Sequence, residues 1–214
     1  MRHRYILIAC SLIAIVIICY KLTPSSEPSP ETDELFKGTL SVGKSAPSLL
    51  IIKVFYEVLC PDSKYFIVKQ LYPAWTKFKM MNVSHLTDIQ LIPFGKAHAQ
   101  MQKGEYTFEC QHGEEECRLN RIHACLIDDK LITFDTKLEM IKCSISNPTK
   151  TSQCGLTECS KGNQLLYENG ILQKADLGKI DFVPTITVNK STQNQYELLK
   201  NFYGEIVSQL KTSL

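Results

Sequence analysis

The chain has 214 residues, 44% of them hydrophobic, and a formal net charge of +2. This size and composition fit one globular domain with an appendage, and the small net charge argues against a nucleic-acid-binding protein. The 9 cysteines are many for a protein of the reducing cytosol and indicate an oxidising compartment.

Residues 1–21 predict entry into the secretory pathway. Arg2 and Arg4 precede an apolar run that ends at Tyr20, and this charge order is typical of a secretory signal. The run offers no small residues for cleavage and is short for a membrane span, so it is either a cleaved signal peptide or an uncleaved signal anchor. Membrane contact is expected only through such an anchor. Residues 22–47, rich in proline and serine, follow as an extended linker.

A strand followed by a cysteine opens the globular domain. Leu49–Tyr56 predicts a buried strand, and Pro61 suits the first position of the next helix, which Pro73 should kink. Cys60 stands between strand and helix, at the positive end of the helix dipole, where a thiolate is stabilised. We therefore predict that Cys60 is a nucleophile; the alternative is an inert buried cysteine. Ser63 takes the place that a second cysteine would occupy in a Cys-x-x-Cys dithiol site.

The later elements complete the pattern of an α/β protein. Their order predicts a thioredoxin-like α/β fold with a disulfide-rich helical insertion over residues 48–210. Pro184 precedes the last strand, and we expect it to form a cis bond with Val183 and to face Cys60; the alternative is a trans proline at an edge strand. Further strands are predicted at residues 86–93 and 185–188, and further helices at residues 115–126, 164–172 and 195–210.

Apart from Cys60, the predicted domain contains enough cysteines for three disulfides. Six cysteines permit 15 pairings, and the sequence does not choose among them. A zinc site is the alternative, but the spacing lacks a paired Cys-x-x-Cys and an oxidising lumen favours disulfides, so neither a metal nor a resident cofactor is expected. The disulfide candidates are Cys110, Cys117, Cys125, Cys143, Cys154 and Cys159, and the zinc alternative would use Cys110, His112, Cys117, His123 and Cys125.

Several polar residues receive structural or surface roles. His112 is expected to be a structural hydrogen-bonding residue, and Glu114–Glu116 a solvated helix start. Asn82 and Asn189 each begin an Asn-x-Ser sequence and are predicted N-glycosylation sites. Glycosylation of both sites would require entry into the secretory pathway.

A long cysteine pattern resembles the signature of a known family. Residues 110–125 read Cys-Gln-His-Gly-x-x-Glu-Cys-x-x-Asn-x-x-x-x-Cys, which resembles the signature of the gamma-interferon-inducible lysosomal thiol reductase family. Shorter matches agree with it, and the resemblance covers about residues 48–195. These matches include Tyr56-Glu57-x-Leu59-Cys60-Pro61, Ile92-Pro93-Phe94-Gly95 and Val183-Pro184-x-Ile186-x-Val188-Asn189.

The resemblance implies a thioredoxin-like fold and reduction of protein disulfides in acidic endosomal and lysosomal compartments. The family's site is Cys-x-x-Cys, so Cys60 takes the attacking position, whereas Ser63 takes the resolving position and cannot resolve a mixed disulfide. Release would then require an external thiol such as glutathione, or a cysteine of the substrate. We therefore expect a lumenal thiol–disulfide oxidoreductase-like protein that acts on disulfide-containing protein clients, in lysosomal degradation or host defence. The alternatives are a catalytically silent thioredoxin-like client-binding protein and a disulfide-stabilised secreted module.

Overall fold

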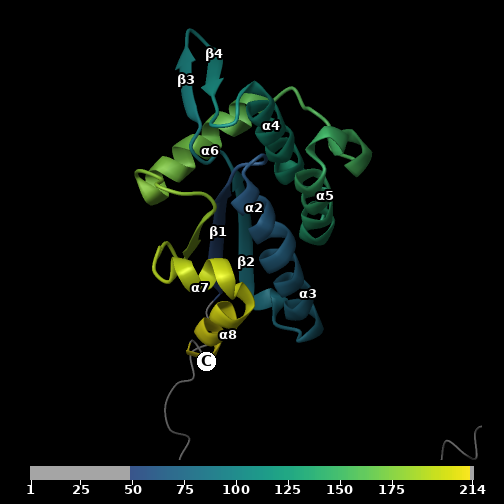
Figure 1. Ribbon diagram of the computed structural model, residues 1–214, viewed down its shortest axis with the longest axis vertical. Coiled ribbons are helices and arrows are strands. Elements are labelled where there is room, and N and C mark those ends of the chain that lie inside the picture. The colour runs from purple at the N-terminus through teal and green to yellow at the C-terminus, as the bar shows by residue number, and fades with distance from the viewer. Residues whose placement is uncertain (1–48, 213–214) are drawn as a thin grey trace, which may run out of the picture. The chain divides into compact units, whose positions relative to one another are not determined.

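The computed structural model describes residues 49–212, so the predicted signal segment and linker lie outside the described residues. Figure 1 shows strands at the centre of the domain with helices around them. Within residues 49–212, no helix is long and apolar enough to cross a membrane. The strands are β1 (Leu50–Tyr56), β2 (Thr87–Pro93), β3 (His98–Gln102), β4 (Glu105–Glu109) and β5 (Thr185–Val188); the helices are α2 (Pro61–Tyr65), the π-helix η1 (Phe66–Leu71), α3 (Tyr72–Met80), the 3₁₀-helix η2 (Ser84–Leu86), α4 (Glu114–Asp128), α5 (Phe134–Ser146), the 3₁₀-helix η3 (Pro148–Cys154), α6 (Gly162–Leu177), α7 (Gln195–Lys200) and α8 (Phe202–Thr212).

The central sheet has the strand order β2-β1-β5. Strands β1 and β2 are parallel, as expected when a helix connects them, and β5 runs antiparallel to β1. The register pairs Phe55 near the end of β1 with Thr185 at the start of β5. The turn after β1 and the residues before β5 therefore lie at the same end of the sheet. This βαβ unit, with the antiparallel strand beside it and helices on both faces, is the thioredoxin-like α/β fold predicted from the sequence.

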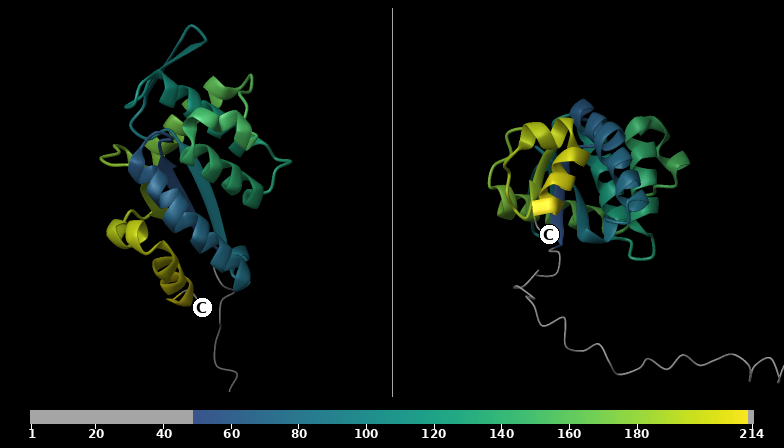
Figure 2. Two further views of the ribbon diagram at one scale, coloured as in Figure 1. Left: turned by 45° about the vertical axis from the view of Figure 1, so that its right-hand side comes forward. Right: turned by 90° about the horizontal axis from the view of Figure 1, so that it is seen from below.

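The two faces of β1 pack against different helices. Ile52 and Val54 are fully buried in the main core, together with apolar residues of α3, α4, α5 and α8. Lys53 points to the opposite face because side chains alternate along a strand, and its ammonium group lies 2.5 Å from the carboxylate of Asp176 in α6. Figure 2 shows the long helix of residues 61–80 lying alongside the strands. This helix and α6 thus cover opposite faces of the sheet.

The helix of residues 61–80 accommodates its internal proline through a π-helical segment. The N–H of Tyr72 donates to the carbonyl of Ile67, five residues earlier, and Pro73 follows directly. A proline lacks an N–H and its ring crowds the preceding turn, so a wider turn at this point gives the ring room. The helix thus changes its helical type directly before Pro73, where the sequence predicted a kink.

Three features of the structure differ from the sequence-based expectations. Strands β3 and β4 form an unpredicted antiparallel hairpin, which projects at one end of the domain in Figure 1. Helices α5 and η3 are additional elements of the insertion. The helix expected at residues 195–210 is broken at Asn201, whose φ of −141° is not helical. The Asn201 side chain accepts a bond from the N–H of Gly204 and occupies the space that a Cβ of Gly204 would need, which starts α8 as a separate helix.

Three disulfides hold the insertion between β2 and β5. Their Cα atoms are 5.6–5.9 Å apart, within the range that unstrained bridges require. The second bridge closes a loop with a sequence separation of 34 and ties α4 to the segment before α6. The pairs are Cys110–Cys117, Cys125–Cys159 and Cys143–Cys154.

Candidate active site

Cys60 lies at the junction between the β1 loop and the long helix. Its backbone is extended, its carbonyl accepts the first helical bond from the N–H of Lys64, and Pro61 occupies the first helical position. Proline favours this position because its missing N–H would have no helical partner there. Among the residues that the structure describes, Cys60 is the free cysteine, and it is 6% exposed. The fold therefore places one thiol at the amino end of the long helix.

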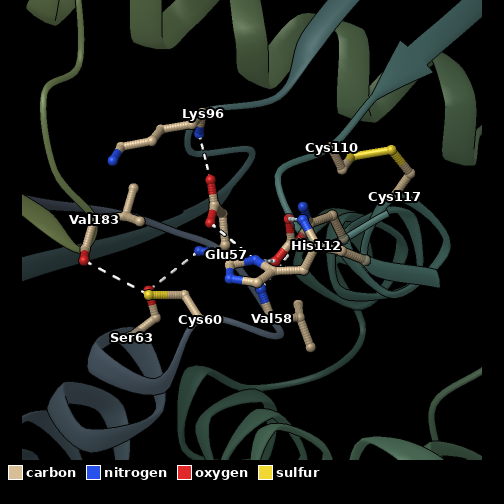
Figure 3. A network of polar contacts seen from close by, with 11 residues as sticks. Glu57, Val58, Cys60, Ser63, Lys96, Cys110, His112, Cys117 and Val183 are labelled. Carbon is tan, nitrogen blue, oxygen red and sulfur yellow. Dashed lines mark hydrogen bonds and ion pairs between the residues drawn. A yellow bond between two sulfur atoms is a disulfide. The ribbon is translucent and has the colours of Figure 1, made fainter. Parts of the chain in front are cut away.

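The sulfur of Cys60 faces the segment that precedes β5. Its Sγ lies 3.7 Å from the carbonyl oxygen of Val183, which can accept a bond from the thiol (Figure 3). The peptide bond between Val183 and Pro184 is cis. The two segments are far apart in the sequence and meet because β5 pairs antiparallel with β1. A thiol and a backbone carbonyl beside a proline thus share one end of the sheet.

Two hydrogen bonds fix the loop that carries Cys60. Ser63, fully buried one turn into the helix, accepts a bond at Oγ from the N–H of Glu57 (3.3 Å). The N–H of Val58 donates to Oδ1 of Asn120 in α4 (3.0 Å). Both acceptors are buried, where a missing partner would be costly. The loop is therefore held between its own helix and α4.

A buried polar chain lies behind this loop. The hydroxyl of Tyr56 lies 2.9 Å from Nδ1 of His123, and Nε2 of His123 lies 2.9 Å from the hydroxyl of Ser144. Burial lowers the pKa of His123 to about 3 and raises that of Tyr56 well above its usual value. Both side chains are therefore neutral at physiological pH. They join β1, α4 and α5 through uncharged hydrogen bonds.

A second polar cluster consists of Glu57, His112 and Glu116. Glu114 and Glu115 are exposed as expected, but Glu116 is fully buried, so the expectation of a solvated Glu114–Glu116 run is wrong at its last residue. Glu116 accepts a bond from the backbone N–H of His112 (3.1 Å), and its other oxygen lies 2.6 Å from Nδ1 of His112. The buried carboxylate of Glu116 is thus held by the backbone and side chain of His112, just before α4 begins.

Glu57 is the buried partner of this cluster. One carboxylate oxygen accepts a bond from the N–H of Lys96 (2.5 Å), and the other lies 3.6 Å from Nδ1 of His112. Burial raises the pKa of Glu57, the Lys96 N–H opposes this shift, and the nearby Glu116 reinforces it. Gly95 makes room for the side chain, since a Cβ there would lie 2.3 Å from Glu57. Glu57 and Glu116 both belong to the motifs that carry the resemblance, but sequence reasoning missed their burial, because a local pattern does not reveal which glutamates are buried.

The disulfides occupy the thiols of the zinc alternative. Cys110, Cys117 and Cys125 are all bonded to other cysteines, and His123 is enclosed between Tyr56 and Ser144. A zinc site built from these cysteines and histidines is therefore ruled out. The structure instead groups His112 with Glu116 of the same signature and with Glu57, which lies in a separate motif of the sequence.

The two glycosylation candidates are both exposed at positions of positive φ. Asn82 follows α3, and Asn189 follows β5, where its Oδ1 accepts a bond from the N–H of Ile51. Their use as glycosylation sites remains a prediction.

Comparison with known proteins places this arrangement in a family. Residues 51–163, more than half of the chain, match the family described as gamma interferon inducible lysosomal thiol reductase (GILT). The gamma-interferon-inducible lysosomal thiol reductase of Mus musculus is 33% identical over 164 residues, which cover 69% of this chain and 64% of that protein. The corresponding protein of Carassius auratus is 28% identical over 179 residues, covering 73% of this chain and 69% of that one.

Among solved structures, DsbA of Chlamydia trachomatis aligns with a TM-score of 0.47 and 13% identity, covering 79% of this chain and 95% of that one. The matched family region contains Cys60, Ser63 and the whole Cys110–Cys125 signature. The chain belongs to the gamma-interferon-inducible lysosomal thiol reductase family.

Proposed function

We propose that the protein acts on disulfides of client proteins through Cys60 as its single nucleophile. The observation that carries this proposal is the free thiol of Cys60, held at the start of a long helix and facing the carbonyl of Val183. A helix amino end favours the negative charge of a thiolate, which is the reactive form. The family membership favours the same chemistry.

The proposed reaction begins with a mixed disulfide. The Cys60 thiolate attacks one sulfur of a client disulfide, forms a new S–S bond, and releases the other client sulfur as a thiolate that takes up a proton. Ser63 has no sulfur to attack this bond. A glutathione thiolate then attacks the mixed disulfide, and a second glutathione completes the exchange. The balance is one client disulfide and two glutathione molecules converted to two client thiols and oxidised glutathione.

A client's own cysteine can also release the mixed disulfide. In that case the disulfide moves within the client, and no electrons are gained or lost overall. The protein would then act as an isomerase and would need no external reductant. Both routes regenerate the free thiol of Cys60.

A silent client-binding protein is the second candidate. The observation that favours it is the 6% exposure of Cys60 together with a buried serine at the resolving position. In this role the protein would bind cysteine-containing clients at the same end of the sheet without turnover. We propose a lumenal setting for either role, in lysosomal degradation or host defence, in line with the family.

The two candidates differ in the effect of a thiol at residue 63. Because Ser63 is buried one turn from Cys60, Ser63→Cys supplies an intramolecular attacker with a side chain of similar shape. We expect the variant to reduce a disulfide-bonded client at least tenfold faster than the native chain at equal pH and glutathione. Native protein should accumulate client complexes sensitive to dithiothreitol.

Two variants serve as controls for this experiment. Ser63→Ala removes the hydroxyl without adding a thiol, so it loses the same bond from the N–H of Glu57 and should not exceed the native rate, and Cys60→Ala should form no complexes. If neither native protein nor Ser63→Cys turns the client over faster than Cys60→Ala does, with the variants folded by circular dichroism, the oxidoreductase is refuted and the binding protein is favoured.

A further inference from the structure

Glu57, His112 and Glu116 form a compact group of potential metal ligands. Their ligating atoms all lie within 4.8 Å of one another, and Figure 3 shows Glu57 and His112 converging beside the Cys60 loop. Both glutamates have fully buried side chains, whereas the His112 side chain is 34% exposed. The cluster thus has two buried carboxylates and is open to solvent on the side of His112.

The charges of this group do not balance within the protein. Two buried carboxylates share one imidazole, which carries at most a single positive charge. The Oε2 atom of Glu57 is buried and has no hydrogen-bond partner in the described part of the chain, although it points into the cluster. A buried carboxylate oxygen without a partner is costly, because it has lost its water and gained nothing in return. A cation bound among the three side chains would give this oxygen a partner and offset the charge of the two carboxylates.

We propose that Glu57, His112 and Glu116 bind one divalent metal ion of the zinc class. Zinc prefers imidazole nitrogen together with carboxylate oxygen, at bond lengths that place tetrahedral ligand atoms about 3.4 Å apart. The 3.6 Å separation of Glu57 and His112 already matches this spacing, and the 2.6 Å contact between His112 and Glu116 opens to admit the ion. The exposed side of His112 provides the entry path and the position for a water ligand.

The site has a structural consequence for the Cys60 loop. Glu57 belongs to this loop and also donates its N–H to Ser63, while Glu116 adjoins the Cys110–Cys117 disulfide. A bound ion would therefore tie the loop to the first turn of α4 independently of any thiol chemistry. This inference does not depend on the proposed function.

Metal binding can be measured directly on the full chain, purified without a histidine tag and with its disulfides intact. After treatment with a chelator, Zn²⁺ is titrated by calorimetry, and bound metal is counted after dialysis. We expect one ion per chain in native protein and at least a tenfold loss of affinity in Glu57→Gln and Glu116→Gln. Glu115→Gln, which alters an exposed carboxylate on the same turn, should bind as the native chain does, and so should Cys60→Ala.

A further variant and a second measurement keep the proposal falsifiable. His112→Gln changes the exposed member of the group and should lower Zn²⁺ affinity even if a buried glutamate variant fails to fold. Zn²⁺ should also raise the melting temperature of native protein but not that of His112→Gln, since a ligand of the folded state stabilises it. Absence of saturable binding, unchanged affinity in these variants, or binding abolished by Cys60→Ala would overturn the site.

Discussion

Because His123 is buried, we predict that the protein loses stability in acid and that the substitution His123→Gln removes this part of the loss. In the folded protein its pKa is about 3, against 6.5 for an exposed histidine. Below pH 6.5, His123 therefore binds a proton in the unfolded chain but stays neutral in the folded chain until the pH approaches 3. The contribution of neutral His123 to the free energy of unfolding is complete above pH 6.5, and it declines as the pH falls toward the pKa of His123 in the folded protein.

The size of the effect follows from these two pKa values. Between pH 7 and pH 5, protonation of the unfolded chain at this one residue lowers the free energy of unfolding by about 2 kcal/mol. His123→Gln lacks the titrating ring, so its stability should change by about 2 kcal/mol less over the same interval. Groups common to both proteins, including Glu57 with its raised pKa, cancel in this difference.

Urea unfolding of the oxidised full chain at pH 7 and pH 5 measures this difference. The variant will be less stable at neutral pH, because Tyr56 and Ser144 lose part of their hydrogen bonding. The informative quantity is the change between the two pH values. His85→Gln, at an exposed histidine, serves as the matched control. If native protein and His123→Gln lose equal free energy on acidification, the burial argument for His123 is refuted.

Two further predictions concern the disulfides and the glycosylation candidate Asn82. Replacing both cysteines of Cys125–Cys159 by alanine should lower the free energy of unfolding by about 4 kcal/mol, and the same change at Cys110–Cys117 should lower it by about 2 kcal/mol. The loss is larger for Cys125–Cys159 because the longer loop gains more freedom in the unfolded chain. Denaturation midpoints that rank in the opposite order would contradict this. Asn82→Gln should abolish one glycosidase-sensitive mass shift in protein from secretory expression, because Asn82 is exposed; an unchanged shift would show that Asn82 carries no glycan.

The sequence alone was enough to predict the features that depend on local pattern. The apolar run at residues 49–56 and the following Cys60-Pro61 are encoded within a few residues, so the strand and the helix start could be read directly. The order of strands and helices then led to the thioredoxin-like fold, which the structure confirms. The spaced cysteines of residues 110–125 indicated the family, which the comparison confirms.

Only the tertiary structure decided which distant residues meet. The disulfide pairing depends on which Cα atoms approach within bonding range, and spacing along the chain does not contain that information. The break at Asn201 and the π-helical turn before Pro73 likewise arise from side-chain and ring contacts that periodicity does not register. Glu57 and Glu116 belong to motifs of the sequence, but nothing in those motifs shows that the two glutamates are buried. They become a buried pair because β1 and α4 pack together, and burial depends on all the elements that surround a residue.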